Sequence, residues 1–395
     1  MINHHKIEYP KFSFVMAPFY FIGDDELLKS QLLNLNNQTV IDFELIVPDP
    51  HYKKREWLKN FVECLKYNVI HFEYVPNKET PKSFDYGILN TAVLMSNSNK
   101  IVTFQDWRFC NRDLVKKLLK FRKYKFIGLR WQVLYKDDSS ISTHWGKSTI
   151  DLNINQANEL YSTGNFPEIN INYEFVNTFH NSCWGHYCID KDLWLEVNGI
   201  DEVVTNTRHY ADLDINTRLE YYHKLNGLKI EIPMLENAMV RIMHSKGNFF
   251  GGSNIELEHN YNVEHIACCF SNTGSMNDKV FTEYVVEKIT KNEYSKIYEI
   301  PYSTNFVKNN TNSSLDSQYA VIGFECNNCG LIGETPHWYE KSPNSRYIAT
   351  IGAGLKNKKI GRNLKKIQID LDNCNFEEKL KILEKSWYDT KYLQE

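Results

Sequence analysis

The chain has 395 residues, of which 42% are hydrophobic and 24% are charged. This is the composition of an ordinary soluble globular protein, and the length predicts either one large domain with an appendage or two domains. The formal net charge of -3 excludes a protein whose whole surface is built to bind nucleic acid. No run approaches the ~18 apolar residues needed to span a bilayer, and residues 1–11 do not resemble a signal peptide, so we expect a cytoplasmic protein without a transmembrane segment.

The first hundred residues alternate between predicted strands and predicted helices. Short apolar runs of strand length occupy residues 12–18, 42–50, 69–76 and 100–106. Apolar residues at helical spacing follow the first three runs, in residues 26–38, 56–67 and 86–98. This rhythm predicts an α/β fold with a mostly parallel sheet and right-handed crossovers.

The rest of the chain is less regular. Residues 125–135 continue the strand pattern, and residues 136–182 are polar and turn-rich, like a loop or an insertion. Residues 183–202 indicate a strand, a helix and a glycine turn, and a helix ending at Gly227 leads into a strand at 228–235. The linker-like composition of residues 303–318 divides the chain into a domain at 1–302 and an accessory region at 319–395. In that region we predict strands at 319–326 and 366–372 and a final helix at 376–393.

Candidate site residues lie at the ends of the predicted strands. No G-x-G-x-x-G or Walker loop follows the first strand, so a nucleotide would have to be held by strand-end carboxylates and loop backbone. The ordered set consists of Pro18, Asp49, Asn90 and Asp106, followed a hundred residues later by Asp212, Asp214 and Arg218.

This arrangement resembles the inverting GT-A glycosyltransferases of the family two group, which transfer a sugar from a nucleoside diphosphate donor. The similarity runs in order from about residue 12 to residue 244. FSFVMAPFY resembles the first strand ending in proline, and DFELIVPDP the strand ending in the base-contacting aspartate, here Asp49. GILNTAVLMSNSNKIVTFQD resembles the helix that carries Asn90 and leads to the metal-binding Asp-x-Asp motif. LWLEVNGIDE resembles the family's Gly-Phe-Asp-Glu segment, and YADLDINTRLEYYHKLNGLKI resembles its Glu-Asp-x-Asp-Leu helix with an arginine. The resemblance implies a Rossmann-like GT-A fold, a mostly parallel sheet flanked by helices, with a C-terminal accessory region.

The resemblance also implies a divalent cation, Mn²⁺ or Mg²⁺, that bridges the donor phosphates. Asp106 aligns with the first aspartate of the metal-binding motif, but Arg108 stands where the second usually lies. One interpretation is that Asp106 and His244 hold the metal, because related enzymes place a histidine after this strand. The other is that the guanidinium of Arg108 neutralises the phosphates itself. A surface Asp-Arg turn without function is a third.

An inverting transfer needs a base that removes the proton from the acceptor hydroxyl. Asp212 aligns with the base of the family, although Ala211 departs from its usual glutamate, and Asp214 and Arg218 would orient the same helix. Trp184 and Gly185 precede this segment, where acceptor contacts usually lie. The alternatives are that Asp212 only complements a helix dipole and that Trp184 is a core residue.

Two further features concern the cysteines and a basic run. Cys326 and Cys329 have the spacing of half a zinc ribbon, which His337, Cys374 or the pair Cys183 and Cys188 could complete. Nine cysteines without regular spacing favour reduced thiols over both structural zinc and a disulfide framework. Residues 356–366 are basic, which is typical of a solvated face but could also attract nucleic acid, anionic lipid or an acidic glycan.

The sequence therefore predicts a glycosyltransferase that moves one sugar from a nucleoside diphosphate sugar, with UDP as the favoured nucleotide, to a hydroxyl of a glycan or other acceptor. The first alternative is the same fold acting on a modified base in DNA, which the basic run favours and the overall acidity opposes. The second alternative is an inactive GT-A module that binds a nucleotide or a glycan, for which Arg108 is the main support.

Overall fold

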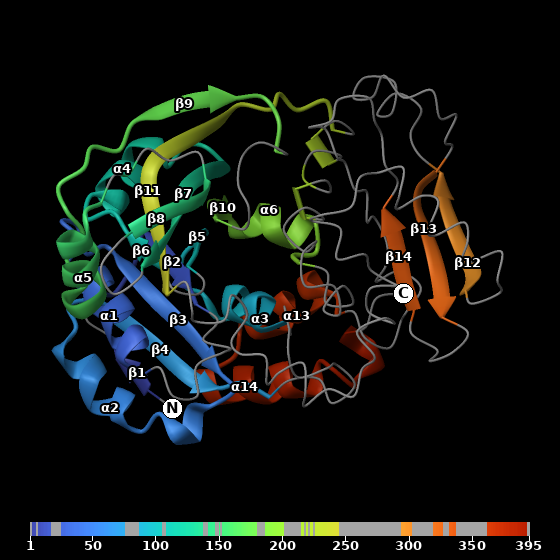
Figure 1. Cartoon of the computed structure of the whole chain (residues 1–395). Helices are drawn as coiled ribbons and strands as arrows, with labels where there is room; N and C mark the ends of the chain where they lie inside the picture. Colours follow the sequence, from blue (N-terminus) through green and yellow to red (C-terminus); the bar gives the residue numbers. More distant parts are fainter. Residues whose placement is uncertain are drawn as a thin grey trace.

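A computed structural model describes residues 2–4, 7–16, 25–75, 87–104, 108–136, 141–146, 150, 152–179, 186–200, 226–244, 294–301, 319–326, 332–336 and 362–392, together with Ile215, Asn216, Leu219, Tyr222 and His223 of one helix. The chain enters a large sheet early and returns to it repeatedly (Figure 1).

The body of the main sheet consists of seven strands. In chain order they are β2 (Phe12–Val15), β3 (Phe43–Asp49), β4 (Asn68–Glu73), β5 (Lys100–Thr103), β7 (Phe126–Lys136), β10 (Tyr187–Asp190) and β11 (Ile232–His244). Their order across the sheet is β4-β3-β2-β5-β10-β7-β11. Strand β10 is antiparallel to both of its neighbours, and the other six run in one direction. The predicted α/β class, a mostly parallel sheet flanked by helices, is confirmed.

Four shorter strands extend this sheet. They are β1 (Ile2–His4), β6 (Arg108–Cys110), β8 (Ile141–Gly146) and β9 (Tyr173–Val176). Each pairs antiparallel with a strand of the body: β1 with β4, β6 and β9 with β11, and β8 with β7. The sheet is thus more mixed at its margins than the sequence pattern predicts.

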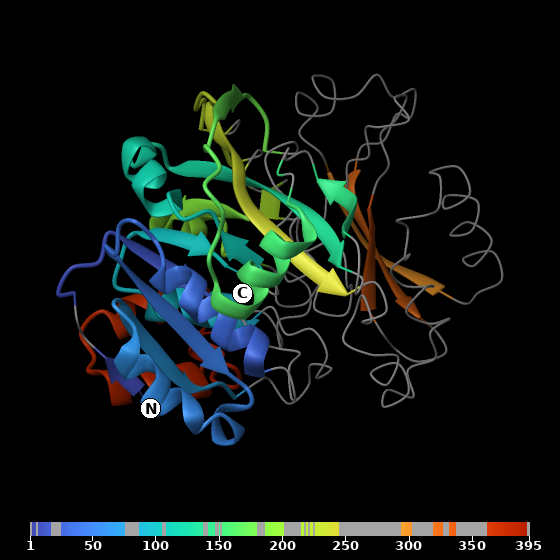
Figure 2. The same cartoon turned by 60° about the vertical axis from the view of Figure 1, so that its left-hand side comes forward.

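Helices cover both faces of the sheet, because alternate residues of each strand are apolar on opposite sides. On one face lie α1 (Asp25–Asn36), α2 (Trp57–Phe61) and α4 (Leu114–Phe121), which share a buried cluster with Phe14, Leu45 and Val69. On the other face lie α3 (Gly87–Met95), α6 (Lys191–Glu196), α13 (Leu364–Leu371) and α14 (Phe376–Lys385). In the turned view the red helices lie behind the blue strands (Figure 2).

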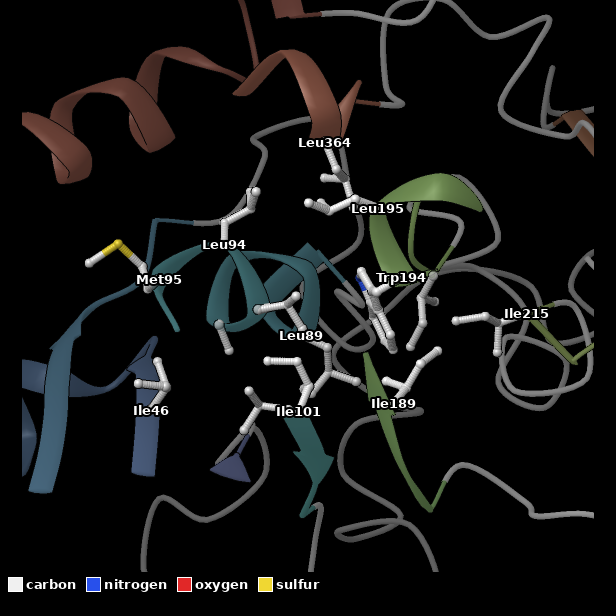
Figure 3. Packing of buried hydrophobic residues seen from close by; sticks show 14 of the residues in the cluster. Ile46, Leu89, Leu94, Met95, Ile101, Ile189, Trp194, Leu195, Ile215 and Leu364 are labelled. Atoms are coloured by element: carbon white, nitrogen blue, oxygen red, sulfur yellow. The ribbon is translucent and has the colours of Figure 1, made fainter. Parts of the chain in front are cut away.

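The second face holds the larger buried cluster. Trp194 of α6 lies between Leu89 of α3 and Ile215, and Leu364 of α13 closes the cluster from above (Figure 3). The C-terminal helices therefore complete the core of the sheet. Arg362 fastens them: this nearly fully buried side chain donates to the Gly87 carbonyl at 3.1 Å and to Ser386 Oγ at 3.0 Å.

Two sequence predictions about elements are corrected, and one interpretation of Arg108 is excluded. Residues 136–182, predicted as a loop or an insertion, are not one loop, since they contain β8, α5 (Ile154–Thr163) and β9. Residues 366–372 are not a strand but most of helix α13. The interpretation of Asp106 and Arg108 as a surface turn does not fit Arg108, which is buried at the start of β6.

The predicted domain division stays a prediction, and two described features bear on it. A second, antiparallel sheet consists of β12 (Tyr294–Pro301), β13 (Tyr319–Cys326) and β14 (Ile332–Pro336), drawn in orange in Figure 1. Strand β12 precedes the predicted linker at 303–318 and pairs with β13, which follows it. Residues 362–392, assigned to the accessory region, pack into the core of the main sheet.

Candidate active site

The carboxyl ends of the six co-directional strands meet at one edge of the sheet, where open α/β sheets bind ligands. Asp49 is the last residue of β3 and His244 the last of β11. Because β10 runs in the opposite direction, its first residues lie at the same edge. Pro18, Asp106, Trp184 and Gly185 flank these strand ends in the sequence but lie outside the described residues, as do Asp212, Asp214 and Arg218.

Backbone and side-chain hydrogen bonds join the strand ends that carry these segments. Phe104 N donates to the Val15 carbonyl at 2.9 Å, so the ends of β2 and β5 lie side by side. Thr103 Oγ1 accepts from Tyr187 N at 3.0 Å, which joins the end of β5 to the start of β10. Asp106 follows Thr103 by three residues and Trp184 precedes Tyr187 by three, so the predicted metal and acceptor segments leave the sheet from adjacent strands.

Asp49 is fully buried, and both of its carboxylate oxygens accept hydrogen bonds. Its Oδ1 accepts from Arg55 Nη1 at 2.6 Å and from His51 N at 2.8 Å, and its Oδ2 pairs with His71 Nε2 at 2.9 Å. Burial by itself would raise the pKa of the Asp49 carboxyl, but the hydrogen bond from His71 and the charge of Arg55 outweigh burial and lower the pKa. A carboxylate has about four acceptor positions, and these three hydrogen bonds use three of them.

Arg55 connects this carboxylate to the start of α1. Its Nε lies 3.4 Å from Asp25 Oδ1, and Trp57 Nε1 donates to Asp25 Oδ2 at 2.9 Å. Burial lowers the pKa of His71 more than Asp49 raises it, so the imidazole is neutral and donates through Nε2. The network positions the first turn of α1, which follows the segment that carries Pro18.

Asn90 has a packing role in the described structure. Its Oδ1 accepts from Ile200 N at 3.0 Å and from Trp194 Nε1 at 3.1 Å, and its Nδ2 donates to the Ile200 carbonyl at 2.7 Å. These bonds tie α3 to the turn after α6 that resembles the family's Gly-Phe-Asp-Glu segment. A direct contact between Asn90 and a donor stays a prediction.

Arg108 is held by an aromatic residue and a histidine. Its guanidinium carbon lies 4.6 Å from the centroid of the Trp131 ring, and its Nη1 donates to His186 Nδ1 at 3.2 Å. The rings of Trp131 and His186 meet edge to face with centroids 5.5 Å apart. The cation–π contact with Trp131 and the hydrogen bond to His186 fix the position of the guanidinium.

The register of β6 bears on the metal ligands. Arg108 pairs with Arg241 in the antiparallel ladder of β6 and β11. In the sequence Asp106 precedes Arg108 by two residues and lies outside the described residues, and His244 follows Arg241 by three. The described residues contain no cluster of His, Cys, Asp or Glu that could hold a metal. The side chains of Asp106 and His244 are not among them.

The zinc prediction and the basic run are only partly described. Cys326 ends β13, and Cys329 and His337 lie outside the described residues. Cys188 is a buried free thiol and Cys374 donates to the Asp370 carbonyl at 3.0 Å. In the basic run, Arg362 is buried and Lys365 pairs with Glu196 at 2.6 Å.

Sequence reasoning missed Arg55, His71, Trp131 and His186. The partners of Asp49 lie 6 and 22 residues away on other elements, and no motif marks them. His186 directly follows the predicted acceptor residues Trp184 and Gly185 in the sequence, and this proximity is the signal that could have identified it.

Comparisons with known proteins give structural matches alone. No family model and no curated protein matches the sequence, and no helix in the described part of the chain is long and apolar enough to cross a membrane. S. aureus TarS 1–349 in complex with UDP-GlcNAc has a TM-score of 0.43 at 12% identity, covering 71% of this chain and 80% of that chain. The same fragment in complex with UDP has a TM-score of 0.39 at 11% identity, with 71% of each chain covered. A longer TarS structure has a TM-score of 0.40 at 13% identity, and the match covers 83% of this chain and 61% of that chain.

Proposed function

We propose that this chain is a GT-A type glycosyltransferase that transfers one sugar from a UDP-sugar to an acceptor hydroxyl with inversion. The observation that supports it is the common direction of the strands that carry or precede the sequence motifs. Strands β2, β3, β5 and β11 run in one direction, and each carries or directly precedes a residue that the motif order assigns to donor or metal binding.

Asp212 is the proposed base, and Asp106 and His244 the proposed metal ligands. A bound Mn²⁺ or Mg²⁺ would neutralise charge on the departing nucleoside diphosphate. The pairing of Arg108 with Arg241 places the strand that follows Asp106 in the sequence beside the strand that ends at His244, which supports this ligand pair. In this proposal Asp49 orients the base of the donor, and Trp184 and Gly185 contact the acceptor.

The alternative functions differ in their support. Arg108 in place of the second aspartate favours an inactive module that binds nucleotide, so that alternative is kept. The DNA-modifying alternative rested on the basic run, of which Arg362 is buried and Lys365 is paired with Glu196. No described residue favours a nucleic-acid partner over a glycan.

A panel of nucleoside diphosphate sugars with and without Mn²⁺ tests the proposal. We expect a UDP-sugar to raise the melting temperature in the presence of Mn²⁺, because a ligand at 100 times its Kd stabilises the native state by about 2.7 kcal/mol. UDP release in an acceptor screen then distinguishes an enzyme from an inactive module. If no nucleotide in the panel changes the melting temperature, both the glycosyltransferase and the inactive nucleotide-binding module are refuted.

A further inference from the structure

His186 carries its proton on a defined nitrogen. An arginine guanidinium only donates hydrogen bonds, so His186 Nδ1, which lies 3.2 Å from Arg108 Nη1, must be an unprotonated acceptor. The neutral imidazole then carries its proton on Nε2. This assignment follows because the Arg108 guanidinium can only donate a hydrogen bond.

The resulting Nε2–H donor is buried without an acceptor among the described residues. The His186 side chain is 1% exposed, and its Nε2 makes no hydrogen bond there. Leaving a buried donor unsatisfied costs about 1–3 kcal/mol, and a bound ligand that supplies an acceptor recovers this cost. The ring is held in place by Trp131 and Arg108, so the donor has a fixed direction.

The position of this donor connects it to the candidate active site. His186 follows the predicted acceptor residues Trp184 and Gly185, and Arg108 follows the predicted metal ligand Asp106 by two residues. Their side chains come together from the start of β10 and from β6. A permanent cation beside a fixed N–H donor selects an anionic oxygen over a neutral hydroxyl, because charge-assisted hydrogen bonds are the stronger ones.

We propose that Arg108 and His186 form a binding site for a phosphate oxygen of the donor diphosphate, so that protein groups neutralise part of its charge alongside the metal. This inference rests on the proposed function. It explains why an arginine can stand where the family has a second metal-binding aspartate: the guanidinium contacts the phosphate directly and adds its positive charge to that of the metal. Trp131 holds that guanidinium in place, and His186 adds a directional donor.

The test compares UDP with uridine by calorimetry in EDTA. We expect wild type to bind UDP more tightly than uridine. His186→Phe, which keeps a ring but removes both nitrogens, should weaken UDP binding about 10-fold and leave uridine binding unchanged. His186→Gln should restore part of the loss, because its amide can donate near the Nε2 position, which a merely structural role would not explain. His223→Phe is the matched control, since His223 is a buried histidine bonded to the Leu219 carbonyl at 2.8 Å, and it should leave the UDP-to-uridine ratio unchanged.

Failure of the inference and failure of the function are distinguishable. Unchanged UDP affinity in His186→Phe, or equal weakening of UDP and uridine, would overturn the inference and leave the glycosyltransferase proposal intact. If wild type binds UDP neither with nor without Mn²⁺, the proposed function fails first. Should His186→Phe not fold, Arg108→Gln carries the same expectation, a 10-fold lower UDP-to-uridine preference, and an unchanged preference there would overturn the inference.

Discussion

Arg55 keeps the buried charge of Asp49 compatible with folding. The two groups lie 2.6 Å apart and are 2% and 0% exposed, so without Arg55 the Asp49 carboxylate would be a buried anion that has lost its nearest cation. The sequence places Asp49 correctly at the end of a strand, but it cannot supply Arg55 and His71, because these contacts depend on how η1 (Tyr52–Lys54), α2 and β4 fold back onto β3. Asn90 is the reverse case: the motif is correctly found, and its described contacts are with Trp194 and Ile200.

Replacing Arg55 by methionine should destabilise the protein strongly. Arg55→Met leaves the Asp49 carboxylate buried without its nearest cation, and breaking a buried pair costs about 3–5 kcal/mol. Lys53→Met is the control two residues away, since its ion pair with Glu73 is exposed and contributes at most about 1 kcal/mol. Urea unfolding of both variants measures the difference. Equal midpoints would show that the Asp49 network does not stabilise the fold.

Gly199 and Gly227 separate backbone strain from packing. Both have a positive φ, 63° and 62°, which costs an alanine about 1–2 kcal/mol. A Cβ at Gly199 would lie 2.2 Å from Asn90 Oδ1 and 2.4 Å from Trp194 Nε1. A Cβ at Gly227 would have no neighbouring atom within 4 Å. We expect Gly199→Ala to cost about 1–3 kcal/mol more than Gly227→Ala in thermal or urea unfolding. A similar cost for both would mean that Asn90 does not hold the turn after α6.

At the scale of elements, spacing predicts the strands and helices of the first hundred residues well, and it fails where two periods compete. Ile367, Ile369 and Leu371 alternate as in a strand, yet α13 is a helix. Asn363 caps it by accepting from Lys366 N, and Leu364, Ile367 and Leu371 are buried at helical spacing while Ile369 is 68% exposed. Helix α5, within residues 136–182, begins at a capping box formed by Asn153 and Gln156, and this sequence pattern could have predicted the helix.

Lys191 couples the start of α6 to the end of α3. Its amine donates to the carbonyls of Ser96 at 3.0 Å and Leu94 at 3.3 Å, and burial lowers its pKa from 10.5 to about 8. The unfolded chain therefore binds more protons at this group between pH 8 and 10.5, so its contribution to the free energy of unfolding rises with pH across that window.

We expect the stability difference between wild type and Lys191→Met to shift in favour of wild type as the pH rises from 8 to 10.5. Urea unfolding at several pH values measures it. Lys229→Met removes an exposed lysine, 82% accessible and paired with Glu231, and its stability difference should stay constant. A pH-independent difference at Lys191 would contradict the lowered pKa.

For the whole molecule, the order of elements is more predictable than the domain division. The motif order along the sequence corresponds to strand ends that the topology gathers at one edge. The composition of residues 303–318 predicts a linker, but composition cannot show that β12 and β13, on either side of it, pair with each other. Arg362 likewise belongs to a basic run by sequence, and its role as a buried anchor for α13 and α14 depends on the Gly87 carbonyl 275 residues away.

The central claim, that this fold transfers a sugar with Asp212 as base, is tested most directly by Asp212→Asn. The substitution keeps the shape of the side chain and removes its basicity, so donor affinity should be retained while turnover falls by roughly 10² to 10⁴-fold. Asp192→Asn, which makes the same change in the first turn of α6, is the control and should leave turnover unchanged. The measurement is UDP release from the UDP-sugar with acceptor present, alongside donor affinity and melting temperature of the same preparation. Loss of turnover with intact donor binding is the predicted result, and full turnover in Asp212→Asn would contradict the assignment.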